Sequence, residues 1–238
     1  MIDLAARRVL EMHYDAMWDN AFDAIAGGAI DYDPHLAAGP DRRRGLTLIA
    51  RPGAALCAHF AVMLDRLTNV EPQQYRYPVA DMHVTILPLF TATDNPAGEL
   101  ARLDDYRAAA SAALQGVETF EIDFDGITLS RSAVMARGFP SGPALETLRE
   151  RLRSQLRERG LDASLDQRYR LVTAHVSLFR FAAGLQDAAR FAALLEELRD
   201  EPFGTMHVEK LELVINDWYM SSKSLEQLEL VRLTSTKA

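Results

Sequence analysis

The chain has 238 residues, a formal net charge of −8 and a single cysteine, Cys57. This length can bury a sizeable core without cross-links, as one large domain or two small ones. The negative charge excludes broad attraction to nucleic acid or to anionic membranes, so an anionic ligand would need a local pocket. We expect no secretory leader and no membrane span, and the thiol-poor composition favours a cytoplasmic protein.

The first 44 residues are predicted to form an N-terminal helical extension and linker. Apolar residues recur at helical spacing over residues 3–28, and the pattern ends at Gly27 and Gly28. Residues 29–45 contain two prolines and further glycine without periodicity, which indicates a linker or wrapping arm. His13 and His35 lie in this extension without a partner at useful spacing.

Strands and helices then alternate along the middle of the chain. The expected order is a strand at 45–52, a helix at 53–70, a strand at 82–90, a helix at 97–116 and a hairpin at 120–139 that turns near Ser130 to Ser132. Strand pairs joined by short turns are antiparallel, so the hairpin already argues against a doubly wound parallel sheet.

The last part of the chain repeats this alternation. A helix is predicted at 143–159, a strand at 169–181, a helix at 187–200, and two closing strands at 206–216 and 225–233. The whole pattern predicts an α+β fold with mostly antiparallel sheet. Each half contains a helix, a His-Val-hydroxyl strand, another helix and a strand pair, which indicates an approximate internal duplication.

Two strands carry the same polar pair. The first reads "DMHVTILPLF" and the second "AHVSLFRF". Because side chains alternate along a strand, His83 and Thr85 share one face, as do His175 and Ser177, with aliphatic residues on the opposite face. A lone strand histidine is usually structural, and His207, which is also followed by valine, lacks the hydroxyl. The repetition in equivalent places favours a functional pair.

Two facing imidazoles are suited to acid–base chemistry. A histidine with an ordinary pKa near 6.5 can accept a proton when neutral and donate one when charged. The adjacent hydroxyls can donate hydrogen bonds to non-bridging phosphoryl oxygens and stabilise charge in the transition state. A phosphodiester held between the two imidazoles fits this arrangement, and the chemistry needs neither a metal nor a cofactor.

These motifs resemble the signature of the 2H phosphoesterase superfamily, which includes the 2′-5′ RNA ligase-like proteins and cyclic phosphodiesterases. The second motif also matches at Arg180, five residues after the histidine, and residues 208–233 are similar to the closing strand, loop and strand of the family. The resemblance covers about Gly45 to Leu233. Arg180 is expected on the face opposite His175 unless a bulge intervenes, so we leave it out of the predicted site.

The resemblance implies two pseudo-symmetric lobes of antiparallel sheet with outer helices around a central cleft, formed by residues 45–238. It also implies that His83 and His175 are the acid and base, that Thr85 and Ser177 bind phosphate, and that no metal is bound. The implied substrate is a 2′,3′-cyclic or 2′,5′-type phosphodiester of a nucleotide or RNA end. Tyr75, Tyr77, Trp218 and Tyr219 are placed by this analogy near the cleft mouth.

Two alternatives remain open at this point. The same fold could serve as a non-catalytic module that binds a nucleotide or an RNA end, or, with less support, as a metal-dependent hydrolase. Asp81 shares the face of His83 and could orient its ring, although a solvated aspartate at the strand end is the simpler interpretation. The sequence does not decide the natural substrate or the oligomeric state.

Overall fold

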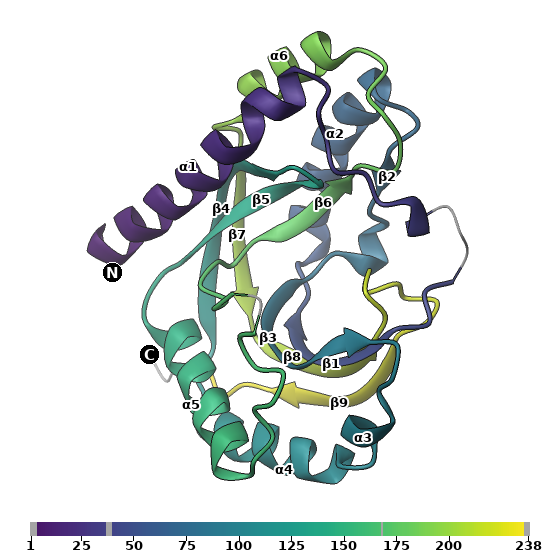
Figure 1. The fold of residues 1–238 in the computed structure, drawn as a ribbon. Coiled ribbons are helices and arrows are strands. Elements are labelled where there is room, and N and C mark those ends of the chain that lie inside the picture. The colour runs from purple at the N-terminus through teal and green to yellow at the C-terminus, as the bar shows by residue number, and fades with distance from the viewer. Residues whose placement is uncertain (1–3, 37–39, 168, 236–238) are drawn as a thin grey trace.

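The computed structural model describes residues 4–36, 40–167 and 169–235. The first residue of the predicted N-terminal helix, residues 37–39 of the predicted arm and the last three residues of the chain lie outside these ranges. Within them, nine strands form one strongly curled sheet in the order β7-β4-β5-β6-β3-β1-β8-β9, with β2 added beside β6 (Figure 1). All pairings between these strands are antiparallel, as predicted.

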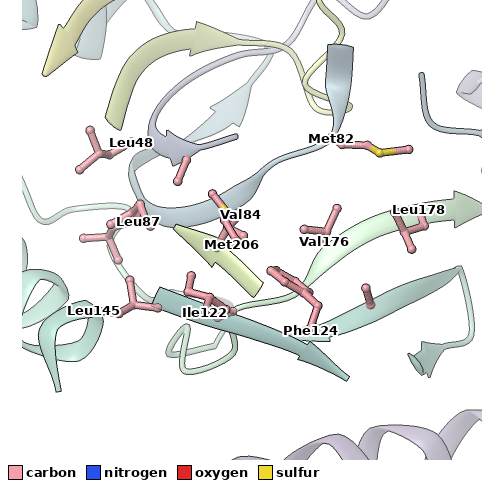
Figure 2. Packing of buried hydrophobic residues seen from close by; sticks show 14 of the residues in the cluster. Leu48, Met82, Val84, Leu87, Ile122, Phe124, Leu145, Val176, Leu178 and Met206 are labelled. Carbon is pink, nitrogen blue, oxygen red and sulfur yellow. The ribbon is translucent and has the colours of Figure 1, made fainter. Parts of the chain in front are cut away.

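The sheet divides into two lobes that meet at a single residue pair. The β4 lobe contains β2 (Tyr75–Arg76), β4 (Phe120–Ser130), β5 (Ala133–Pro140), β6 (Val176–Arg180) and β7 (Pro202–Val208). The β1 lobe contains β1 (Arg44–Ala50), β3 (Val84–Thr93), β8 (Lys210–Asn216) and β9 (Glu226–Arg232). Among the described strands, only Val84 of β3 and Val176 of β6 pair across the junction, and Figure 2 shows both among buried side chains from the two lobes.

Helices cover the outer faces of the lobes (Figure 1). The β4 lobe carries α1 (Leu4–Ala26), α2 (Ala54–Val70) and α6 (Ala188–Leu198), whereas α4 (Leu103–Leu114) and α5 (Ala144–Glu158) pack together beside β3. The α5 helix begins after Pro143 and ends before Gly160, whose φ of 59° is the left-handed conformation that glycine adopts readily. No helix among the described residues combines the length and the apolar character needed to cross a membrane.

Two expected elements are divided in the structure. The helix predicted at 97–116 is interrupted and becomes α3 (Ala97–Leu100) and α4. The single strand predicted at 206–216 is two strands, β7 and β8, which break at Glu209 because the chain passes from β4 in one lobe to β1 in the other. Helix η1 (Pro34–Leu36) and helix η2 (Val79–Asp81) are short turns that periodicity does not reveal.

The strand predicted at 169–181 is shorter than expected, because only β6 (Val176–Arg180) has regular pairing. The backbone before it is held by side chains instead of by a neighbouring strand. The buried Arg149 guanidinium donates hydrogen bonds to the carbonyls of Val172 and Thr173, and the Tyr14 hydroxyl accepts one from the Ala174 amide. Backbone groups satisfied in this way do not form a strand ladder.

Candidate active site

His83 lies immediately before β3, and its ring orientation is fixed by the main chain. The Nδ1 atom is 2.7 Å from the carbonyl oxygen of Asp81. A carbonyl can only accept a hydrogen bond, so Nδ1 carries the proton and Nε2 of the neutral ring is left as an acceptor. The Asp81 side chain is buried and accepts from the Ser222 amide, so the expectation of a solvated carboxylate is wrong.

His175 occupies the equivalent position immediately before β6. Its Nδ1 atom lies 2.8 Å from the hydroxyl of Thr173, a buried residue. The backbone on both sides is anchored, because Arg149 binds the Thr173 carbonyl and Tyr14 binds the Ala174 amide. The segment that carries the imidazole is thus held by hydrogen bonds on both sides, although it is not a strand.

The Val84–Val176 pair brings the two motifs together. In an antiparallel pair with this register, His83 stands across from Ser177 and Thr85 across from His175. Alternation then puts these four polar side chains on the face opposite the two valines. The four residues are half-buried and line one cavity of about 240 Å³. The structure therefore brings together all of the side chains that the sequence predicts for the site.

Arg180 lines the same cavity because β6 contains a bulge. Val134 of β5 pairs with Phe179 and Met135 with Ser177, so Leu178 is an extra residue without a partner on β5. An extra residue reverses the alternation beyond it, and Arg180 comes to lie on the same side as Ser177. Its Nε donates to the Tyr77 hydroxyl at 3.3 Å. The bulge that Arg180 needs in order to reach the site is therefore present.

Bulges also shape the other wall of the cavity. Ile86 and Leu89 are extra residues of β3 relative to β1. Thr85, Pro88 and Thr91 consequently all face the cavity, although strict alternation would place Pro88 on the face opposite the two threonines. These irregularities increase the local twist, and the sheet curls around the site.

The surroundings favour the neutral form of both imidazoles. Burial lowers the pKa of His83, while the hydrogen bond to the Asp81 carbonyl acts in the opposite direction. The pKa of His175 is lowered to about 4, mostly by burial and additionally by the nearby charges of His83 and Arg149. Arg180 acts in the same direction. Both rings line the same cavity, so a charged His83 disfavours protonation of His175.

Aromatic residues contribute to the wall of the cavity. Tyr77, Trp218 and Tyr219 line it, as the family resemblance implies, whereas Tyr75 packs against the Tyr77 ring with centroids 5.1 Å apart. Two of these aromatic residues contact the N-terminal segment. The Tyr219 hydroxyl donates to Asp33 at 2.6 Å, and the Arg43 guanidinium lies 4.6 Å from the centre of the Trp218 ring.

Two residues that hold the backbone of the site, Tyr14 and Arg149, are not predicted from the sequence. The sequence pattern could have indicated Arg149, because it shares the buried face of α5 with a row of leucines. A charged residue in such a place requires specific partners. Arg149 donates to the carbonyls of Thr85 and Ile86 in the first motif and to those of Val172 and Thr173 just before the second. Tyr14 had no such signal, because an aromatic residue on a helix is ordinarily core.

Within the described part of the chain, no group of three or more histidine, cysteine, aspartate or glutamate residues is arranged to hold a metal ion. Asp166 is the one acidic residue among the cavity-lining residues, and its carboxylate is bound by the Arg153 guanidinium.

Comparison with known proteins assigns the family. A family model described as the 2′-5′ RNA ligase superfamily matches residues 54–219. The structure is similar to TT0787 of Thermus thermophilus (TM-score 0.59, 18% identity, 82% of this chain and 100% of that chain). It is also similar to E. coli LigT complexed with ATP (TM-score 0.53, 16% identity, 81% and 99%). No protein with a curated description matches. The chain belongs to the 2′-5′ RNA ligase superfamily of 2H phosphoesterases.

Proposed function

We propose that this protein is a metal-independent phosphodiesterase that hydrolyses a 2′,3′-cyclic or 2′,5′-type phosphodiester of a nucleotide or RNA end. Membership of the superfamily supports a phosphodiesterase-type enzyme. The observation that carries the finer proposal is the single cavity lined by His83, Thr85, His175 and Ser177. E. coli LigT has been crystallised with 3′-AMP, which is consistent with a small nucleotide as substrate.

In the proposed reaction His175 is the base and His83 the acid. The low pKa of His175 keeps its ring neutral, so it can take a proton from water. The water oxygen forms a bond to phosphorus as the bond from phosphorus to one ribose oxygen breaks. His83 donates its Nε2 proton to that leaving oxygen, and the Asp81 carbonyl stabilises the charged ring beforehand. The product is a phosphomonoester with a free ribose hydroxyl.

Three further groups stabilise the charge that develops on the phosphoryl oxygens. The hydroxyls of Thr85 and Ser177 donate hydrogen bonds to non-bridging oxygens, and Arg180 supplies positive charge from the same side as Ser177. The bulge at Leu178 makes this assistance possible, because a regular strand would direct Arg180 away from the substrate.

The test is hydrolysis of a panel of 2′,3′-cyclic nucleotides and 2′,5′-linked dinucleotides in the presence of a chelator. His83→Ala and His175→Ala should each lower kcat by at least about 100-fold, the usual contribution of one acid or base. His207→Ala is the matched control, because His207 is also followed by valine but lies on β7, where it contacts Glu121 instead of the cavity.

Three results would contradict the proposal. Full activity in either cavity variant would exclude the acid–base pair. Activity lost in chelator and restored by a divalent metal would indicate a metal-dependent hydrolase. Tight binding of a nucleotide monophosphate by calorimetry, with no product after long incubation, would indicate the non-catalytic binding module.

A further inference from the structure

Tyr14 links the N-terminal helix to the backbone beside His175. The side chain is fully buried, although α1 lies outside the part of the chain that the family model matches. Its hydroxyl donates to the Gly138 carbonyl at 3.0 Å and accepts from the Ala174 amide at 3.1 Å. The Gly138 amide approaches the same oxygen at 3.3 Å. One donor and two acceptor positions are all that a tyrosine hydroxyl offers, and each is used.

The hydroxyl stands where β5 and the segment before β6 would otherwise pair directly. The last regular pair is Ala136 with Val176, and continuing that register would place Gly138 opposite Ala174. The two backbones approach closely here, since a side chain on Gly138 would lie 2.0 Å from the Ala174 carbonyl oxygen. The Tyr14 hydroxyl therefore replaces a ladder hydrogen bond. Without it, the buried Ala174 amide would lose its partner.

Two distant side chains thus hold the residues that lead into His175. Arg149 of α5 holds the Val172 and Thr173 carbonyls, and Tyr14 of α1 holds the Ala174 amide. We propose that Tyr14 is a positioning residue that sets the place of the His175 ring, so that the N-terminal helix is a working part of the active site. This inference rests on the proposed function in that it treats His175 as the catalytic base.

Tyr14 would act on the position of His175 and not by proton transfer, because its hydroxyl does not lose its proton near neutral pH. Burial raises its pKa to about 12, and the hydroxyl remains a donor to the Gly138 carbonyl. A displacement of the base by a fraction of an ångström lengthens its contact with the attacking water. Misplacement of about 1 Å can reduce the rate by about 100-fold without any change in the groups that bind substrate.

The decisive variant is Tyr14→Phe, which removes the hydroxyl and keeps the ring. We expect kcat to fall by about 10- to 100-fold, with KM within about twofold of the original. The ring resonances of His175 in an NMR spectrum should move or broaden. Thr128→Val is the matched control, because the buried Thr128 hydroxyl donates to the Tyr14 carbonyl and ties the same helix to β4 without contacting the His175 segment. The control should retain kcat and the original His175 resonances.

A Tyr14→Phe enzyme with unchanged kcat and unchanged His175 resonances would overturn the proposal. So would a Thr128→Val enzyme that loses as much kcat at an equal loss of melting temperature, since the effect would then be general destabilisation. Amide exchange in the unsubstituted protein needs no variant, and a rapidly exchanging Ala174 amide would also overturn the proposal. Because the NMR measurements need no substrate, they remain decisive if no phosphodiester is hydrolysed and the proposed function fails.

Discussion

The main-chain carbonyl of Asp81 contributes to a difference in proton affinity between the two histidines. It accepts from His83 and favours the charged ring, whereas His175 contacts a hydroxyl, which can donate or accept and so imposes less preference. Nearby positive charge acts against protonation of His175. Two imidazoles with similar sequence surroundings therefore differ in proton affinity, which is the condition for one to act as acid and the other as base.

This difference predicts the pH dependence of the reaction. The active form of the free enzyme has His175 neutral, which holds above its pKa of about 4, and His83 charged, which holds below a pKa that burial lowers from 6.5. We expect kcat/KM to be greatest on the acidic side of pH 6.5 and to fall by about tenfold per pH unit beyond the upper pKa. The check is a profile of kcat/KM at constant ionic strength.

The acidic limb of this profile can be moved by one substitution. The charge of Arg180 lowers the pKa of His175, so Arg180→Gln should raise that pKa and shift the acidic limb to higher pH. A profile that keeps rising through neutral pH in the original enzyme would contradict the assigned protonation states. An unshifted acidic limb in the variant would remove His175 as the group responsible for it.

At the scale of the elements, the close approach of β5 to the His175 segment requires glycine at one position. A Cβ at Gly138 would lie 2.0 Å from the Ala174 carbonyl oxygen, which cannot move without displacing the residue before His175. We expect Gly138→Ala to lower the free energy of unfolding by about 1–3 kcal/mol and to reduce kcat. Gly142→Ala is the control, because a Cβ there has nothing within 4 Å. Equal urea midpoints for the two variants would refute this reading of the contact.

Local patterns in the sequence predict the strands of the site and the faces of their side chains. The departures from these patterns result from contacts with residues distant in the chain. Alternation correctly assigns Thr85 to the face of His83 and Ser177 to the face of His175, because it follows from backbone geometry alone. The bulge at Leu178 depends on pairing with β5 and is invisible to a local pattern, so alternation alone leaves Arg180 out of the site. The late start of β6 likewise depends on Tyr14 and Arg149, which are remote in the chain.

At the scale of the whole molecule, the lobes are joined by more than the Val84–Val176 pair. Helix α2 lies between β1 and β3 in the sequence but packs against β6 and β7 of the other lobe. Helix α5 lies between β5 and β6 but packs beside β3 (Figure 1). Each lobe therefore has one helix that packs against the other lobe, and one buried cluster contains residues of both lobes. Neither lobe can unfold without exposing apolar surface of the other.

This exchange of helices predicts that the molecule unfolds in one step, although chains of this length commonly show intermediates. The two tryptophans provide independent probes, because Trp18 lies on α1 over the β4 lobe and Trp218 follows β8 in the β1 lobe. In the Trp18→Phe and Trp218→Phe variants, urea transitions followed by the remaining tryptophan should coincide with those followed by far-ultraviolet circular dichroism. The comparison is made within each variant, so a change in stability does not affect it. An earlier Trp218 transition would mean that the β1 lobe unfolds separately and that the exchanged helices do not couple the lobes.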